Sequence, residues 1–143
     1  MLGEVAFMHK ASSFGFSLAL PYGHAHAYDF IVDSGSRESG SRESGSKLWR
    51  VQVKTTAYKV RGAYRVTICR RGNQSAHAYT ASEIDFVAVY IIPDDSWYIL
   101  PVCVVAGHTT LRFRPSGDPR RDNYGHFREG WRRLREPDGL TFG

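Results

Sequence analysis

The chain has 143 residues, a length typical of one domain with one hydrophobic core, and we expect residues 1–143 to form a single unit. Hydrophobic residues make up 42% of the chain and charged residues 23%, as in ordinary globular proteins, and no apolar run approaches the ~20 residues that span a bilayer. The formal net charge of +5 favours a polyanionic partner, because each lysine or arginine that neutralises a phosphate releases condensed counterions.

The N-terminal segment predicts a helix followed by two short strands. Residues 2–13 carry a broad apolar side, and Gly15 is a suitable residue to end the helix. The segment has no basic stretch followed by an apolar one, so we expect no signal peptide and a cytoplasmic location. Residues 16–20 predict a short strand, and residues 28–32 (YDFIV) predict a second strand that is apolar except at Asp29.

A low-complexity insertion separates this strand from the next. Residues 34–46 read SGSRESGSRESGS, a five-residue unit that occurs twice and then begins again. The segment has no apolar residue with which to offset the entropy of ordering, so we expect a flexible loop. Loop closure costs grow slowly with length, so such an expansion is compatible with the domain around it.

Residues 48–55 (LWRVQVKT) alternate cleanly between apolar and polar side chains, which predicts a strand with one buried face. Gln52 and Lys54 share its polar face. Residues 63–69 (AYRVTIC) alternate in the same way, and we expect them to pair with residues 48–55 as a hairpin around the Arg-Gly turn at 61–62.

The second half of the chain predicts two more strands and a final helix. Thr80 and Glu83 have the spacing of a capping box, and residues 86–92 (FVAVYII) form an apolar run typical of a strand buried on both faces. Residues 97–105 predict a returning strand with a bend or an edge position at its proline, and residues 124–134 predict a last helix. The predicted fold class is therefore mixed α/β, built around one central sheet.

One acid on a strand, followed by a polar-x-Lys pattern on a neighbouring strand, predicts a metal site. If residues 28–32 pair with residues 48–55, Asp29 lies beside Gln52 and Lys54. Asp29 would offer a carboxylate and Gln52 an amide oxygen, which are ligands that Mg²⁺ accepts. Lys54 would place a cation over the attacking water or the scissile phosphate, and Glu4 could complete the site from the first helix.

The same residues also fit a purely structural interpretation. Gln52 and Lys54 are compatible with a solvated strand face, and Asp29 with an acid at the end of a strand. Glu4 lies in a first helical turn, where an acid is favourable through the helix dipole alone. Spacing does not separate the two interpretations, because D-x(n)-Q-x-K patterns arise often by chance.

Several segments together resemble the PD-(D/E)XK homing endonucleases associated with group I introns of bacteria. They are GEVAFMHKASSFGF at 3–16, YDFIV at 28–32, LWRVQVKTT at 48–56, YTASEIDFVAVYIIP at 79–93 and WYILP at 97–101. This family is a variant in which Gln stands where most PD-(D/E)XK enzymes have Asp or Glu. Tyr28 replaces the proline of the motif, and the insertion is expected near the mouth of the site, where it could disturb cleavage.

The resemblance implies a restriction-endonuclease-like fold with an αβββαβ core, a mixed central sheet and flanking helices. It implies a catalytic group made of Glu4, Asp29, Gln52 and Lys54. Glu4, Asp29 and Gln52 would bind Mg²⁺, for which Mn²⁺ can substitute. The implied reaction is hydrolysis of a phosphodiester bond in double-stranded DNA, by an enzyme whose gene lies within an intron.

Basic residues around the predicted site are candidates for contacts with DNA. They flank the Q-x-K segment or follow it along the chain: Lys47, Arg50, Lys59, Arg61, Arg65, Arg70 and Arg71. The arginine-rich last third of the chain is expected to add phosphate contacts. The same residues also suit any exposed hairpin. His24 and His26 lie in a loop without a third convergent ligand, so we expect them to be exposed to solvent.

Cleavage of both strands of a duplex with one site per chain needs two chains, so we expect a homodimer or homotetramer. Two rival functions remain open. One is a structure-selective nuclease of the Holliday-junction resolvase kind, which would use the same residues. The other is a DNA-binding protein of the same fold without cleavage activity, because the neutral Gln52 removes one negative charge from the metal site. We find no motif for an RNA-directed protein.

Overall fold

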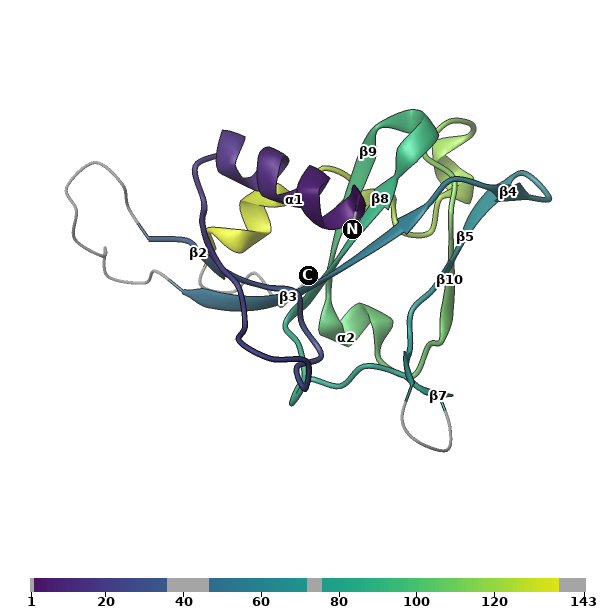
Figure 1. The fold of residues 1–143 in the computed structure, drawn as a ribbon. Helices are drawn as coiled ribbons and strands as arrows, with labels where there is room; N and C mark the ends of the chain where they lie inside the picture. Colours follow the sequence, from purple (N-terminus) through teal and green to yellow (C-terminus); the bar gives the residue numbers. More distant parts are fainter. Residues whose placement is uncertain (1, 36–46, 72–75, 137–143) are drawn as a thin grey trace.

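The computed structural model describes residues 2–35, 47–71 and 76–136. Helix α1 (Leu2–Ser13) is followed by β1 (Ser17–Ala19), β2 (Phe30–Asp33) and β3 (Leu48–Thr56). Shorter strands come next: β4 (Lys59–Val60), β5 (Ala63–Thr67), β6 (Arg70–Arg71) and β7 (Ala76–His77). The remaining elements, with η for a 3₁₀ turn, are β8 (Phe86–Ile91), η1 (Ile92–Asp94), β9 (Ser96–Pro101), α2 (Val102–Val105), β10 (Thr110–Phe113), η2 (Pro119–Arg121), η3 (Gly125–Phe127) and η4 (Trp131–Leu134) (Figure 1).

The central sheet has five strands in the order β1-β2-β3-β8-β9. Neighbouring strands are antiparallel except β3 and β8, which are parallel, so the sheet is mixed as predicted. The apolar run at 86–92 forms β8, which lies between β3 and β9 and is buried along almost its whole length. The returning strand β9 occupies the edge and ends at Pro101, after which residues 102–105 form α2 rather than more strand.

A second, three-stranded sheet in the order β10-β5-β4 corrects one predicted pairing. The Arg61-Gly62 turn was predicted correctly, since both residues have the positive φ of a tight hairpin turn, at 53° and 80°. However, β5 pairs with β4 and β10, and not with β3. The tight turn sets Val60 opposite Ala63 and Lys59 opposite Tyr64, so the partner of β5 is the short strand β4 that follows β3.

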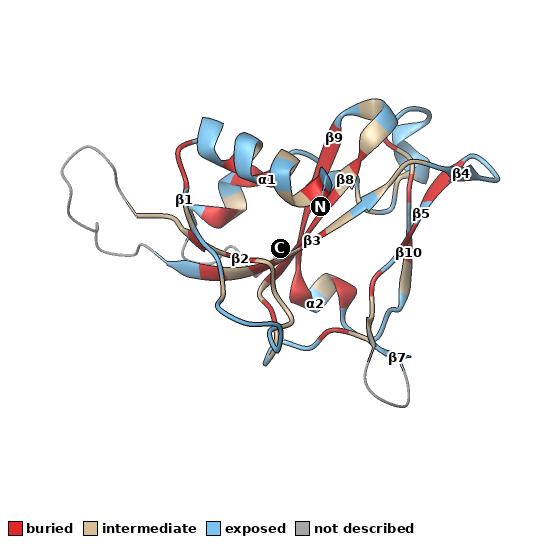
Figure 2. Cartoon of the chain, viewed as in Figure 1, coloured by how far each residue is buried: buried red, intermediate tan, exposed pale blue. Residues whose placement is uncertain are grey.

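Two hydrophobic cores lie on opposite faces of the central sheet, because alternate residues of each strand point to opposite sides. One core joins the sheet to α1 and η4, and the other joins it to β5, β10 and α2. Figure 2 shows the buried residues of β8 and β9 between these layers, while the outer side of α1 is exposed. The sheet is therefore covered on both sides near β8.

Helix α1 is held on its face of the sheet by Phe7 and by a close contact at its first turn. Phe7 is fully buried, and its ring centroid lies 5.1 Å from that of Phe30 in β2. Gly3 packs so closely on β3 that a Cβ atom added to it would overlap the Thr55 methyl group. This contact fixes the first turn of the helix, and with it the next residue, Glu4.

The predicted helix at 124–134 is wrong. The chain forms two separate 3₁₀ turns, η3 and η4, interrupted by Glu129, which has a φ of 52°. The Glu129 backbone N–H donates to the Trp97 carbonyl at 2.7 Å, and Glu129 Oε1 accepts from the Trp97 N–H at 3.0 Å. These bonds pair the backbone groups of Trp97 at the edge of β9. The chain therefore runs along the strand at the point where a helix would need to continue.

One of the two bonds of the predicted capping box at Thr80 forms, from the Thr80 N–H to the Glu83 carboxylate, but no helix follows it. Thr80 N–H donates to Glu83 Oε1 at 3.1 Å, and the backbone N–H groups of Glu83 and Ile84 donate to the Thr80 carbonyl. Only one turn results, because β8 begins at Phe86. Among the described residues between β3 and β8, the crossover thus consists of short strands and this turn.

The insertion is anchored at the far end of the β2–β3 pair. Ser34 and Lys47 close its base: the Ser34 N–H donates to the Lys47 carbonyl at 3.0 Å, and the Lys47 N–H donates to Ser34 Oγ at 2.8 Å. Gln52 lies five positions beyond Lys47 along the chain, or ~17 Å of extended strand. The base of the insertion therefore lies away from Gln52 along β3. Residues 36–46 lie outside the described residues, so the expected position of the insertion near the mouth of the site stays a prediction.

Candidate active site

Asp29 lies directly before β2, where the β2–β3 ladder ends. Its backbone N–H donates to the Val51 carbonyl at 2.9 Å, and its Oδ2 accepts a hydrogen bond from the Val53 N–H at 2.8 Å. The register that sets Phe30 opposite Val51 continues to place Asp29 opposite Gln52. Oδ1 is left without a hydrogen-bond donor in the part of the chain that the structure describes.

Gln52 and Lys54 project from the same face of β3. Their parallel neighbours in β8 are Val87 and Val89, which are fully buried in the core on that face. Gln52 and Lys54 are only half-buried, because the covering layer ends between the two strands. The polar pair therefore lies where a buried sheet face opens to solvent.

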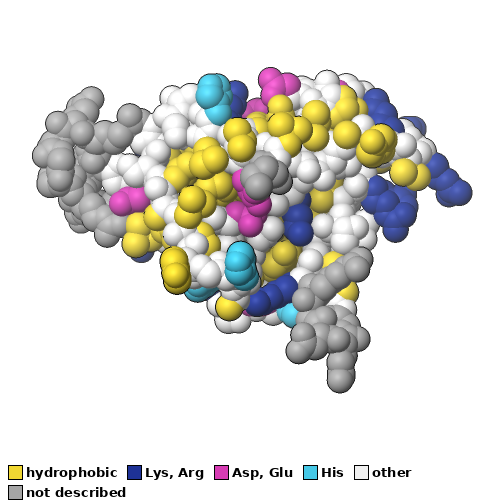
Figure 3. All heavy atoms as spheres, in the orientation of Figure 1, with side chains coloured by type: hydrophobic (Ala, Val, Ile, Leu, Met, Phe, Trp, Pro, Cys, Tyr) yellow, Lys and Arg dark blue, Asp and Glu magenta, His cyan; other side chains and the backbone are white. Residues whose placement is uncertain are grey.

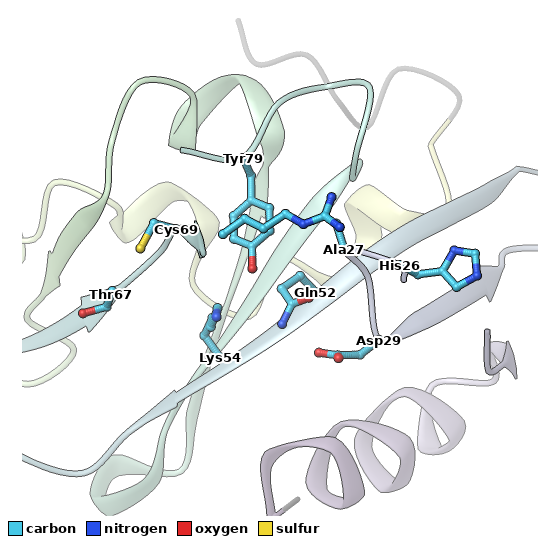
Figure 4. A pocket seen from close by; sticks show the side chains of 9 residues that line it. His26, Ala27, Asp29, Gln52, Lys54, Thr67, Cys69 and Tyr79 are labelled. Carbon is cyan, nitrogen blue, oxygen red and sulfur yellow. The ribbon is translucent and has the colours of Figure 1, made fainter. Parts of the chain in front are cut away.

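A cleft of about 450 Å³ opens at this position. Asp29, Gln52 and Lys54 line it, so the structure brings these three predicted residues together. In Figure 4 the Tyr79 hydroxyl points toward Gln52 and Lys54, while Asp29 lies on the side of β3 nearer to α1. The other walls are formed by the loop before β2, the end of β5 and its continuation, and the segment before β8: His26, Ala27, Thr67, Cys69, Arg70 and Tyr79.

A second acid, Glu4, acts on Asp29 beside this cleft. Burial raises the pKa of Asp29 above its ordinary value, and the nearby Glu4 carboxylate raises this pKa further. The Val53 hydrogen bond and the Lys54 ammonium act in the opposite direction. Glu4, in the first turn of α1, is thus near enough for its negative charge to raise the pKa of Asp29. A cation bound to both carboxylates would offset their repulsion.

Tyr79 and Arg70 form the wall opposite β3. Lys54 Nζ lies 5.7 Å from the centroid of the Tyr79 ring, and burial together with the charge of Asp29 raises the pKa of Tyr79 to about 12. Arg70 is fixed by two bonds, from Nη1 to Glu83 Oε2 at 2.8 Å and from Nη2 to the Ala25 carbonyl at 3.1 Å. A phenol that stays protonated and a held guanidinium therefore face the predicted site.

The donor set fits a hard divalent cation. Within the described residues, no three His, Cys, Asp or Glu side chains gather into a metal-binding group. The oxygen donors at the cleft are instead the Asp29 carboxylate and the Gln52 amide, with Glu4 near Asp29. Carboxylate and amide oxygens are ligands for Mg²⁺, and a site with few protein ligands is usual for this ion because it keeps several waters.

The family model of the PD-(D/E)XK endonucleases matches residues 2–128. The chain belongs to this family. The matched range contains Glu4, Asp29, Gln52 and Lys54, all four members of the predicted catalytic group. That Tyr28 replaces the proline of the motif, and Gln52 its second acid, stays a prediction from the sequence.

The fold of this PD-(D/E)XK chain is similar to that of a solved structure, described as "a bacterial homing endonuclease: I-Ssp6803I". The TM-score is 0.76 at 22% sequence identity, and the match covers 94% of this chain and 88% of the other. This likeness confirms the predicted restriction-endonuclease-like fold class. A search of curated proteins gives no match. None of the helices in the described ranges has the length and apolar character needed to cross a bilayer.

The residues predicted to contact DNA are dispersed, and two of them, Arg50 and Arg70, have side chains bonded within the molecule. Arg50 donates to both oxygens of Asp85 and to the Ser82 and Ala81 carbonyls, and so fastens β3 to the turn before β8. Lys47 lies at the base of the insertion, and Arg70 lines the cleft. The other predicted contacts lie along β4, β5 and β6: Lys59, Arg61, Arg65 and Arg71, the last with its side chain outside the described part.

Sequence reasoning missed the wall of the cleft. Tyr79 precedes the capping-box Thr80, a position whose apolar side chain often packs on the residue four places into the turn. That rule would have predicted the contact of Tyr79 with the core around Ile84. Nothing in the local pattern indicates that the same ring lies over Lys54. His26, expected to be exposed, is exposed, and it also lines the cleft.

Proposed function

We propose that this PD-(D/E)XK endonuclease hydrolyses phosphodiester bonds of double-stranded DNA with the help of a divalent metal ion. The observation that carries the proposal is the convergence of Asp29, Gln52 and Lys54 on one cleft, with Glu4 close enough to shift the pKa of Asp29. The match of the family model over residues 2–128 and the homing endonuclease described for the similar structure support a site-recognising DNA endonuclease.

The metal would be held by Asp29 and Gln52, with Glu4 as the further acid. The Gln52 amide now donates from Nε2 to the Val53 carbonyl at a long 3.3 Å, so little is lost if it rotates to present Oε1. When bound, Mg²⁺ or Mn²⁺ would supply Lewis-acid chemistry, which lowers the pKa of a nearby water and offsets negative charge at phosphorus.

The chain's own residues would bind and orient the scissile phosphate. In the part of the chain that the structure describes, the Lys54 ammonium forms no ion pair and is held over the Tyr79 ring, so it is available to a phosphate oxygen. Arg70, held by Glu83 and the Ala25 carbonyl, offers a second cation from the opposite wall. Both charges oppose the negative charge that builds on the phosphate as water attacks.

Replacement of Lys54 tests this proposal, and Lys10 provides a matched control. Each lysine lies 5.7 Å from an aromatic ring centroid, Tyr79 for Lys54 and Phe14 for Lys10. We expect Lys54→Ala to reduce Mg²⁺-dependent cleavage of a plasmid library by roughly 100-fold or more, while Lys10→Ala stays close to wild type. Full activity in a folded Lys54→Ala protein, judged by circular dichroism, would refute the assignment.

A DNA-binding protein without cleavage is the second candidate, because Gln52 is neutral and Asp29 is the one carboxylate that lines the cleft among the residues the structure describes. Thermal unfolding with added Mg²⁺, Mn²⁺ or Ca²⁺ discriminates the two. A metal ion that binds the folded chain raises Tm by mass action, and an endonuclease should show this rise. The absence of any rise, together with intact DNA binding, would favour the second candidate.

A further inference from the structure

The outer face of the β10-β5-β4 sheet carries an arginine cluster apart from the catalytic cleft. Arg65 of β5 and Arg112 of β10 are directly opposite each other in the antiparallel register, and both are exposed. Val66, Leu111 and Phe113 point the other way into the core. Strand alternation therefore fixes the two arginines side by side on the surface.

Arg114 and Arg121 extend this cluster. With Arg112 and Asn123 they line an open cavity of about 360 Å³. Arg114 Nη1 donates to the Gly62 carbonyl at 3.3 Å, and its backbone N–H donates to Asp122 Oδ1 at 3.2 Å. Asp122 Oδ2 in turn accepts the Tyr98 hydroxyl at 2.7 Å, so this carboxylate fastens the segment around Arg121 against β10.

Within the described ranges, no carboxylate forms an ion pair with the arginines of the cluster, since Asp122 accepts from the Arg114 backbone N–H and the Tyr98 hydroxyl. Among the described residues Arg65, Arg112 and Arg121 form no ion pair, whereas the neighbouring Arg120 pairs with Asp118 at 3.0 Å. Like charges directly opposite each other on antiparallel strands destabilise a sheet. An anion that contacts both Arg65 and Arg112 removes this repulsion, and the forked guanidinium groups match the oxygens of a phosphate.

The cluster continues from the catalytic cleft along one strand. Thr67, which lines the cleft, lies two residues beyond Arg65 on the same face of β5. Two residues of strand span ~7 Å, which is comparable with the separation of neighbouring phosphates in one strand of DNA. Figure 3 shows basic side chains gathered over β4, β5 and β10, beside the face that carries the cleft.

We propose that Arg65, Arg112, Arg114 and Arg121 form a phosphate-binding track for the backbone of the DNA that enters the cleft. The track binds phosphates flanking the scissile one and gives affinity without sequence preference. This inference rests on the proposed function, because a phosphate next to the cleft is expected only if DNA is the substrate.

Equilibrium binding to a short mixed-sequence duplex, with Ca²⁺ in place of Mg²⁺ and over a series of salt concentrations, tests the track. We expect Arg65→Gln and Arg112→Gln to weaken binding equally for unrelated sequences. Each should lower the slope of log K against log salt by about 0.9 for every phosphate contact that is lost. The Tm of both variants should stay equal to wild type or rise, since one of two opposed like charges is gone.

Arg120→Gln is the matched control, because it removes the same charge close by from an arginine that already has a partner. It should leave the salt slope nearly unchanged. The track alone would be overturned if Arg65→Gln and Arg112→Gln keep the wild-type affinity and the wild-type slope of log K against log salt, while the protein still binds and cleaves DNA. Failure of the wild-type chain to bind DNA would overturn the track together with the proposed function.

Discussion

Asp29 is a carboxylate placed where both burial and a second acid oppose its charge. Its pKa is raised, so the protonated form is favoured in the folded chain relative to the unfolded one. Stability from this group is present below the ordinary Asp pKa and is lost as pH rises through the raised value. The folded metal-free chain therefore loses stability between acid and neutral pH through this residue, and a bound cation would restore it.

The substitution Asp29→Asn distinguishes the stability cost of the Asp29 charge from the proposed role of this residue in metal binding and cleavage. The amide is nearly isosteric, and its Oδ atom can still accept from the Val53 N–H. We expect loss of cleavage and of the metal-induced rise in Tm, with metal-free stability at neutral pH equal to wild type or higher. Urea unfolding across pH measures this directly. A marked loss of metal-free stability in the variant would show that Asp29 has a structural role instead.

The sequence was most informative about the individual residues of the candidate site. Gln52 and Lys54 lie two residues apart on one strand, so their shared face follows from strand period alone. Asp29 followed from the pairing of two neighbouring strands, which the structure contains. Tyr79 and Arg70 reach the cleft through a crossover whose path depends on the packing of distant segments, and no local pattern predicts that.

At the scale of elements, the contact of α1 with β3 links helix position to the site. An alanine at Gly3 would overlap the Thr55 methyl group and push the first turn of the helix away from the strand. We expect Gly3→Ala to cost roughly 1–3 kcal/mol of unfolding free energy and to reduce cleavage further than this loss explains, because Glu4 moves from Asp29. Thr55→Ser removes the clashing methyl, so the double variant should recover both. No recovery would show that the overlap is not the cause.

The turn that follows Tyr79 is held to β6 through Glu83, whose side chain accepts a hydrogen bond from Arg70. Bonds from Arg70, then from Thr80 and His77, hold the pKa of Glu83 at about 2. A lowered pKa stabilises the fold above the ordinary value and this stability is lost as pH falls toward 2. We expect Glu83→Gln to cost about 1–2 kcal/mol at pH 7, allowing for solvent screening at the partly exposed Arg70.

Chemical denaturation at several pH values measures this, and the difference between Glu83→Gln and wild type should narrow as pH falls from about 4 toward 2. Asp118→Asn is the control, since its ion pair with Arg120 is fully exposed and should contribute little measurable stability. If the difference in unfolding free energy between Glu83→Gln and wild type does not change with pH, the charge of Glu83 is not the cause of the effect.

Element types were easier to predict than element partners. Alternation at 48–55 and 63–69 gave the correct strands, because a half-buried strand shows its period in the sequence. Their pairing was wrong because strand partners depend on which edges the rest of the sheet leaves open. The predicted helix at 124–134 failed for a related reason, since residues 128–129 are used to cover the edge of β9.

For the whole molecule, the exposed side of α1 bears on assembly. Leu2, Val5 and Met8 lie three residues apart on this side and are 64%, 52% and 36% exposed. We predict a homodimer or homotetramer, because cutting both strands needs two sites, and this apolar side is the surface to test as its contact. Sedimentation velocity should show an oligomer in wild type and a shift toward monomer in Val5→Gln/Met8→Gln, with unchanged circular dichroism. A wild-type monomer that makes double-strand breaks would contradict this.

The Ser34–Lys47 contact at the base of the insertion has a practical consequence. The backbone and side chain of Ser34 close the β2–β3 pair before the repeat begins, and this closure is remote from Gln52 along β3. A change in the length of the chain between Ser34 and Lys47 should therefore leave Asp29, Gln52 and Lys54 in place, because this closure holds the two strands together independently of those residues.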